Sequence, residues 1–203
     1  MQKRHSVFTS ELLIVIHDLM PEHMFRSFFL TGSQGAGKSF LVNRIASSFD
    51  SVIVRTAFAP DRNTLELSIP QGRIFKVAFR KEDRMIPVVE AFDIAADQID
   101  SLNPGERLLL VDEVGYLEEC SLKYMSAIIS LLKRSSRFIC VLRYGDVKFI
   151  EKLRREIDVQ LILLTRSNQH EVFQYISEEL KKKHLDEIGK GKDNPSPGGD
   201  GGI

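Results

Sequence analysis

Short apolar runs alternate with longer amphipathic segments along most of this 203-residue chain. The apolar runs have the length of buried strands, and the segments between them carry apolar residues at helical spacing. This alternation predicts an α/β fold with a mostly parallel sheet, because each helix returns the chain to the edge where the next strand begins. The runs that we assign to five parallel core strands span residues 25–32, 51–58, 107–113, 137–143 and 159–165.

The amphipathic segments predict five helices, which would complete a three-layer α/β/α sandwich. Between the second strand and the second helix, residues 64–79 form two short apolar runs around Pro70-Gln71-Gly72. Pro and Gly favour a turn at this point, so we expect a β-hairpin inserted into the five-stranded core. The predicted helices span residues 38–49, 88–102, 121–134, 147–156 and 168–183.

Both ends of the chain depart from this alternation. Residues 1–24 have a basic start and a short apolar run, as a signal segment does, but Glu11 precedes the run and Asp18 follows it. We therefore predict an N-terminal helical extension there rather than a targeting segment. Residues 184–203 are rich in Gly, Pro, Asp and Lys, a composition that predicts a disordered tail. The folded domain is accordingly expected at residues 25–183.

The composition argues against several classes of protein. Lys plus Arg equal Asp plus Glu, so the net charge is zero, which argues against a dominant surface for nucleic acid or anionic membrane. No apolar run reaches the length of a membrane span. Cys120 and Cys140 form neither a C-x-x-C motif nor a secreted disulfide pattern, so we expect a reducing, cytoplasmic location.

One basic cluster could contact RNA or a partner protein. Three acids dilute its charge, so a solvated helix face is the simpler interpretation. We expect no membrane partner; a nucleic-acid partner is disfavoured but stays open, as does a protein partner. The cluster consists of Lys148, Lys152, Arg154 and Arg155, with Asp146, Glu151 and Glu156 between or beside them.

The first chemical signal is GSQGAGKS at Gly32–Ser39, which matches G-x-x-x-x-G-K-[ST] between a predicted strand and a predicted helix. Its glycines let the loop curl so that backbone N–H groups point inward at phosphate oxygens. Lys38 would reach the β- and γ-phosphates, and the Ser39 hydroxyl would bind Mg²⁺. The residues expected to contact the nucleotide here are Gly32, Ser33, Gln34, Gly35, Ala36, Gly37, Lys38, Ser39 and Phe40.

The second signal is a buried strand that ends in paired acids, Asp112 and Glu113. Ligands of open α/β sheets gather at this edge, so Asp112 would hold Mg²⁺. Glu113 could then orient a water molecule and accept its proton, or it could be a solvated loop carboxylate. The first alternative favours hydrolysis, because a nucleotide kinase needs no base for water. Glu118 and Glu119 are expected to begin the next helix, where acids suit the helix dipole.

Three stretches make the chain similar to a known family: FFLTGSQGAGKSFLV, LLLVDEVGYLEECSLKYMSAIISLL and VQLILLTRSNQHEV. The second is similar to the family's D-E-I-G-x-[ML]-E segment, and the third to its closing strand and T-x-x-N-R turn. Over residues 25–180 the chain thus resembles the THEP1-like nucleoside triphosphatases, small P-loop proteins of the additional-strand (RecA/AAA-like) branch.

The resemblance implies hydrolysis of ATP, GTP and other nucleoside triphosphates to diphosphates, with Mg²⁺ as cofactor and loose base selectivity. Lys38, Ser39, Asp112 and Glu113 fall on matching motif positions. Lys38 and Glu113 are therefore candidate catalytic residues, and Ser39 and Asp112 are candidate metal ligands. Two other functions stay open: a nucleotide or small-substrate kinase, and a nucleotide-gated ATPase switch that acts on a protein or nucleic acid.

Some positions differ from the family pattern. Arg143 stands where the fourth strand of the family usually ends in His, and it could stabilise transition-state charge or be a solvated loop arginine. Gln169 replaces the Arg expected after Asn168. Thr165 and Asn168 could line the base, or Asn168 could cap the last helix.

Overall fold

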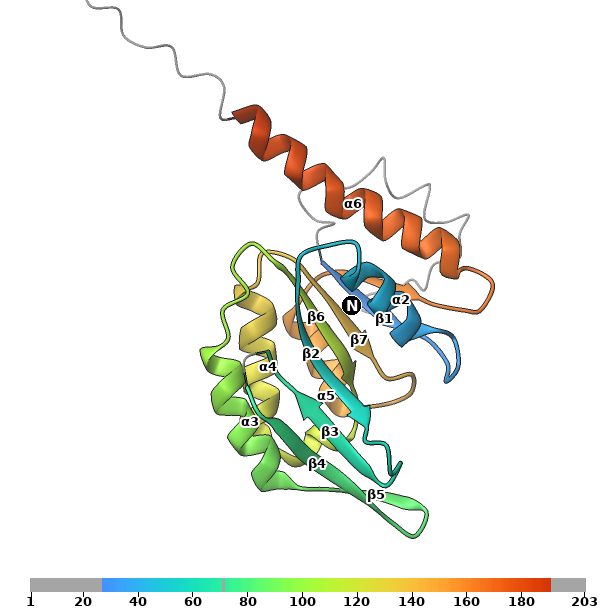
Figure 1. The fold of residues 1–203 in the computed structure, drawn as a ribbon, viewed down its shortest axis with the longest axis vertical. Coiled ribbons are helices and arrows are strands. Elements are labelled where there is room, and N and C mark those ends of the chain that lie inside the picture. Colours follow the sequence, from blue (N-terminus) through green and yellow to red (C-terminus); the bar gives the residue numbers. More distant parts are fainter. Residues whose placement is uncertain (1–26, 71, 191–203) are drawn as a thin grey trace, which may run out of the picture.

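A single eight-stranded sheet runs through the computed structural model, which describes residues 27–70 and 72–190 (Figure 1). The strand order is β5-β4-β3-β2-β6-β7-β1-β8. The strands are β1 Phe28–Thr31, β2 Ser51–Phe58, β3 Thr64–Ser68, β4 Ile74–Lys81, β5 Arg84–Pro87, β6 Leu108–Val114, β7 Phe138–Leu142 and β8 Gln160–Leu163.

Five of these strands form the parallel core. β2 pairs with β6, β6 with β7, β7 with β1 and β1 with β8, all in parallel. The predicted five-stranded parallel core is therefore confirmed. β7 lies between β1, which leads into the phosphate loop, and β6, which ends in the paired acids.

The other three strands extend the sheet in antiparallel fashion. β3 and β4 pair as the predicted hairpin, and β3 joins the hairpin to β2. The sheet has one strand more than predicted, because β5 pairs with the end of β4. The turn between them is Glu82-Asp83, and Glu82 has a φ of 54°. A two-residue turn with positive φ is usually marked by Gly or Asn, so this sequence lacks the signal that would have revealed the strand.

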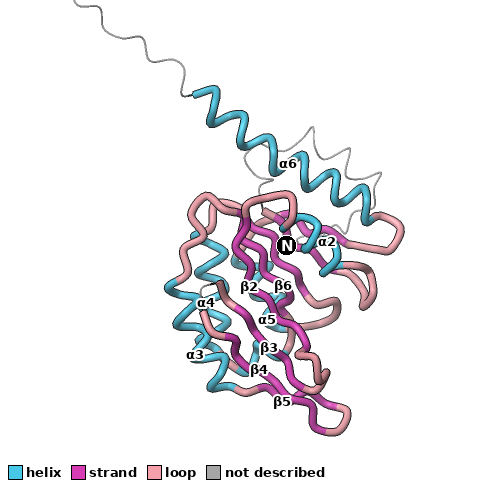
Figure 2. The backbone as a smooth tube through the Cα atoms, viewed as in Figure 1, coloured by secondary structure: helices cyan, strands magenta, loops and turns pink. Residues whose placement is uncertain are grey.

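Helices cover both faces of the sheet, as the predicted three-layer sandwich requires (Figures 1 and 2). Alternate β6 residues face opposite layers: Leu109 and Val111 pack with α3, α4 and α5, whereas Leu108 and Leu110 pack with α2 and α6. This double burial explains the unbroken apolar run of β6. The helices are α2 Lys38–Ala46, α3 Val89–Ser101, α4 Leu122–Arg134, α5 Lys148–Glu156 and α6 Gln169–Lys190, with a 3₁₀ turn, η2, at Leu117–Cys120.

The predicted domain ends are only partly covered. The N-terminal extension expected at residues 1–24 lies outside the described residues, as do residues 191–203 of the expected tail. α6 continues to Lys190, past the predicted end at residue 183. Within the described residues, no helix is both long and apolar enough to cross a membrane.

Candidate functional site

The phosphate loop leaves β1 and curls around the amino group of Lys38. The Lys38 Nζ donates to the carbonyl oxygens of Gly32 at 2.8 Å and Ser33 at 3.3 Å. Gly35 and Gly37 have φ values of 78° and 95°, a region that glycine enters without the steric cost of a Cβ. The predicted loop is thus present, with its lysine folded back onto its own first residues.

The turn between β8 and α6 holds this loop in place. The Gln169 Nε2 donates to the Ala36 carbonyl at 2.7 Å, and the Arg166 Nε donates to the Gly35 carbonyl at 3.2 Å. A Cβ on Gly32 would lie 2.4 Å from the Leu164 carbonyl oxygen, so only glycine allows this close approach. Sequence reasoning missed both contacts, although it noticed that Gln169 replaces an expected arginine.

Asp112 lies near the end of β6, in the same pocket as Ser39, the second residue of α2. Its carboxylate is buried. Burial raises the pKa of Asp112, and the positive charges of Arg55 and Lys38 and the hydroxyl of Ser39 oppose this shift. The fold thus brings Ser39 and Asp112, which lie 73 positions apart in the sequence, to the same pocket.

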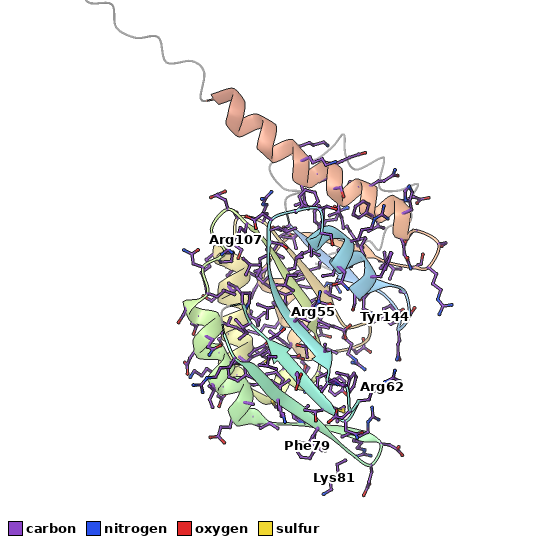
Figure 3. All side chains as sticks on the ribbon, viewed as in Figure 1. Arg55, Arg62, Phe79, Lys81, Arg107 and Tyr144 are labelled. Atoms are coloured by element: carbon purple, nitrogen blue, oxygen red, sulfur yellow. The ribbon has the colours of Figure 1, made fainter. Side chains whose placement is uncertain are left out.

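Arg55 is a member of this site that sequence reasoning missed. Arg55 lies on β2 (Figure 3). Parallel pairing of β2 and β6 sets it opposite Asp112, and the Arg55 Nε lies 3.7 Å from Oδ2 of that carboxylate. The Arg55 Nη2 also donates to Oδ1 of Asn43 on α2 at 2.6 Å. The register between two predicted strands is the signal that could have revealed this arginine.

The site suits a magnesium ion. Ser39 and Asp112 offer a hydroxyl and a carboxylate oxygen, and Mg²⁺ is usually held by one or two such groups plus waters and substrate phosphates. Among the described residues there is no cluster of three or more His, Cys, Asp or Glu that would build an all-protein cage. The Nε of Arg55 is buried without a hydrogen-bond partner, because Oδ2 of Asp112 lies 3.7 Å away.

Glu113 lies between two cations. Its Oε2 is 3.7 Å from the Lys38 Nζ, and its Oε1 is 3.7 Å from Nη1 of Arg143. Burial raises the pKa of Glu113, and these two cations oppose the rise. About a third of the side chain is exposed, so solvent reaches this carboxylate. The ion pairs distinguish Glu113 from an ordinary solvated loop carboxylate.

Arg143 directly follows β7 and contacts the Glu113 carboxylate at the oxygen that Lys38 does not contact. Its backbone N–H donates to the Val114 carbonyl at 2.8 Å, which ties the turn after β7 to the end of β6. Its guanidinium lies over the Tyr116 ring, 4.8 Å from the centroid. The arginine is half exposed but points toward Glu113, and its role in charge stabilisation stays a prediction.

Glu118 is a second site residue that sequence reasoning placed elsewhere. It does not begin α4, as expected, because η2 comes first and Ser121 caps α4 by accepting from the Tyr124 N–H at 3.0 Å. Only 3% of Glu118 is exposed, and its Oε2 accepts from the Gly115 N–H at 2.9 Å. Burial raises the pKa of Glu118 to about 7.

Glu119 was also expected to begin α4, and it serves a different helix. Its Oε1 accepts from the Phe149 N–H in the first turn of α5 at 2.8 Å. The two adjacent glutamates thus have separate roles, one in the site and one as a helix cap.

These groups surround a pocket of about 200 Å³ at the carboxyl ends of the parallel strands. Of the predicted catalytic and metal-binding residues, Ser39, Asp112, Glu113 and Arg143 line it, and Lys38 lies against Glu113. Phe40, predicted to contact the nucleotide, is 62% exposed on α2 and does not line it. The lining residues are Ser39, Thr56, Ala57, Phe58, Leu65, Asp112, Glu113, Gly115, Tyr116, Leu117, Glu118 and Arg143.

Asn168 lies apart from this pocket, in the turn before α6. Its Oδ1 accepts from the Thr165 N–H at 2.8 Å, and its Nδ2 donates to the Leu163 carbonyl at 3.0 Å. Both ends of the amide therefore stabilise the turn itself. Asn168 directly precedes α6, and its backbone carbonyl accepts from the Val172 N–H at 2.9 Å. A contact of its side chain with the base stays a prediction.

The chain is similar to known proteins in sequence and in fold. A family model described as NTPase matches residues 71–177, more than half of the chain. A search of curated protein sequences found no match.

Two solved structures share the fold. One is THEP1 from the hyperthermophile Aquifex aeolicus, with 18% identity, a TM-score of 0.58, and coverage of 76% of this chain and 99% of that one. The other is a human cancer-related nucleoside triphosphatase, with 18% identity, a TM-score of 0.61, and coverage of 77% and 98%. At this identity the two likenesses establish the fold alone.

Proposed function

The chain belongs to the NTPase family of THEP1-like nucleoside triphosphatases, and from this premise we propose that it hydrolyses nucleoside triphosphates with Mg²⁺ and with loose selectivity for the base. The observation that carries the proposal is the position of Glu113. It lies next to Asp112 and between the cations of Lys38 and Arg143. This arrangement suits a carboxylate that orients a water molecule beside the terminal phosphate and accepts its proton.

The phosphate loop would bind the polyphosphate. Its N–H groups and the N-terminus of α2 attract anions, and the Lys38 amino group adds a full charge. Lys38 now donates to the carbonyls of Gly32 and Ser33, and it can exchange these for phosphate oxygens without leaving the loop. Ser39 and Asp112 would hold Mg²⁺, which when bound neutralises charge on the phosphates.

Glu113 would orient the attacking water and accept its proton. The water oxygen forms a bond to the γ-phosphorus, the bond from phosphorus to the β–γ bridging oxygen breaks, and the diphosphate leaves. A carboxylate whose pKa is raised by burial is a better proton acceptor than a solvated one. Arg143, on the other side of Glu113, would stabilise charge that develops on the transferred group.

Loose base selectivity is supported by the turn before α6. Selective recognition needs polar groups that are free to bind the edge of the base. Both ends of the Asn168 amide and the Nε2 of Gln169 are occupied by hydrogen bonds within the chain. We therefore expect ATP, GTP, CTP and UTP to be hydrolysed at rates within about tenfold of one another.

The decisive test is the substitution Glu113→Gln, which keeps the shape of the side chain and removes its basicity. We expect kcat for phosphate release to fall by roughly 10²- to 10⁴-fold, the usual contribution of a general base. Nucleotide affinity, measured by calorimetry, should change only a few-fold. Glu90→Gln, at an exposed position in the first turn of α3, is the matched control and should behave as wild type. Undiminished hydrolysis by the Glu113 variant would refute the assignment.

A further inference from the structure

The pocket extends away from the phosphate loop. Ser39 is its only lining residue from the loop and α2. The other walls come from the end of β2, from β3, from the end of β6 with η2, and from Arg143 after β7. A polyphosphate bound over the loop therefore reaches the pocket with its terminal phosphate, and most of the pocket lies beyond that phosphate.

This space is larger than hydrolysis requires. One water molecule occupies roughly 30 Å³, and the pocket holds about 200 Å³. The terminal phosphate and the metal take their share near Ser39 and Asp112, on the side of the loop. Part of the remaining wall, at Phe58, Leu65 and Leu117, is apolar.

Two aromatic rings, of Phe58 and Tyr116, line the pocket together with the carboxylates of Asp112 and Glu113. The Phe58 side chain is 52% exposed and the Tyr116 side chain 44% exposed, although both line the pocket. Arg143 already lies over the ring of Tyr116. Exposed rings beside a cavity are suited to stack on another planar ring.

Polar groups stand among these rings. Thr56 and Glu118, whose side chain is buried, line the same pocket as Glu113. Apolar walls with a few convergent polar groups are typical of a small-molecule site. The ligand that fits this combination has a planar ring to stack and a hydroxyl group that can reach Glu113.

We propose that this pocket is a subsite for a second substrate, a hydroxyl compound with a planar ring such as a nucleoside, and that the chain transfers the terminal phosphoryl group to it as well as to water. The inference rests on the proposed function, because both reactions use the same donor and the same Glu113. Water would then be the acceptor when the subsite is empty.

The transfer forms one bond to phosphorus and breaks one. The hydroxyl oxygen of the acceptor forms a bond to the γ-phosphorus, and the bond from phosphorus to the β–γ bridging oxygen breaks. Glu113 accepts the hydroxyl proton and later releases it to solvent. The products are a nucleoside diphosphate and a phosphorylated acceptor.

The test uses the full chain with Mg²⁺ and ATP labelled at the γ-phosphate, alone and with adenosine, guanosine, cytidine or thymidine. Free phosphate and labelled nucleoside monophosphate are measured in the same reaction. We expect at least one nucleoside to become labelled and the share of free phosphate to fall. If phosphate is released but no nucleoside becomes labelled, the proposed subsite is wrong and the hydrolase proposal still stands. Failure to cleave ATP at all would overturn both.

Two phenylalanine variants locate the acceptor. Phe58→Ala removes a pocket wall, whereas Phe79→Ala removes a similarly exposed ring on β4 outside the pocket (Figure 3). We expect Phe58→Ala to lower the ratio of nucleoside monophosphate to free phosphate by roughly tenfold, as loss of one stacking contact predicts. Phe79→Ala should leave the ratio unchanged. An equal effect of both variants, or none for Phe58→Ala, would refute this subsite.

Discussion

Glu118 and Glu119 are neighbours of the same type whose surroundings have little in common. The 3₁₀ geometry of η2 turns Glu118 into the pocket and Glu119 outward to α5. Glu118 is almost completely buried, and the nearby negative charge of Glu113 adds to the cost of ionising it. A carboxyl group with these surroundings titrates near neutrality, which gives the site a group that changes charge in the physiological range.

Glu118 should make stability depend on pH in a defined direction. The pKa rises from 4.5 in the unfolded chain to about 7 in the folded chain. Between these values the folded chain holds a proton that the unfolded chain has lost, so the free energy of unfolding falls as pH rises, by roughly 3 kcal/mol in total. The substitution Glu118→Gln should remove this slope. Urea unfolding of both proteins at pH 5, 6, 7 and 8 measures it, and parallel curves would contradict the prediction.

The sequence predicts those site residues that a local motif contains. Lys38 and Ser39 follow a glycine-rich turn, and Asp112 and Glu113 end an apolar run, so each pair is visible within a few positions. Arg55 is different, because it becomes a site residue only through its register with Asp112 on the next strand. No local pattern contains that register.

At the scale of elements, the phosphate loop and the turn before α6 form one unit. Gln169 and Arg166 donate to consecutive carbonyls of the loop, and Gly32 touches the backbone of Leu164. The loop shape is therefore set in part by residues about 130 positions away. A loop that is held before the nucleotide arrives loses less conformational freedom on binding.

Gly37→Ala tests this coupling, with Gly105→Ala as its control. Both glycines have positive φ, so each alanine should cost about 1–2 kcal/mol of backbone strain. A Cβ on Gly37 would also lie 2.4 Å from the Gln169 Nε2, whereas one on Gly105 meets nothing within 4 Å. The Gln169 amide must then swing away and lose its bond to Ala36. We expect only Gly37→Ala to weaken nucleotide binding, measured by calorimetry; equal affinities for the two variants would argue against the coupling.

Most elements follow from their own sequence, and the exceptions have physical causes. β2 spans the predicted residues 51–58, because a β-branched, alternating run needs no distant support. β5 has only four residues and no alternation, and it is a strand because β4 offers it an edge. Helix ends depend on neighbouring elements in the same way, and α6 ends at Lys190, later than the predicted residue 183.

At the scale of the whole molecule, the two helical layers bury both faces of the parallel core, while the β3–β5 extension projects beyond α2 and α6 (Figure 1). Charge is distributed without a dominant sign. In the basic cluster on α5, Lys152 pairs with Glu156, which also binds Lys133 of α4. The charge of Lys152 is thus partly neutralised, and the interpretation of the cluster as a solvated helix face stays a prediction.

Nucleotide binding should stabilise the entire fold, because the loop, α2, β6 and the turn before α6 all meet at the site. A ligand at 100 times its Kd contributes about 2.7 kcal/mol, which corresponds to a rise in Tm of roughly 5–10 °C for a domain of this size. Lys38→Ala should abolish most of this rise, and so should removal of Mg²⁺ with a chelator. Thermal unfolding with and without Mg²⁺ and a slowly hydrolysed ATP analogue measures the effect. A full shift in the Lys38 variant would contradict the role given to this lysine.

The position of β1 in the sheet has a consequence for synthesis. β1 and the phosphate loop leave the ribosome before the other strands of the sheet. The strands that flank β1 are β7 and β8, in which Ile139 and Gln160 pair with Phe28. A nascent chain that already carries both nucleotide motifs therefore still lacks the neighbours that hold β1. Such long-range pairing slows folding, so the binding site matures only after β7 and β8 have been synthesised.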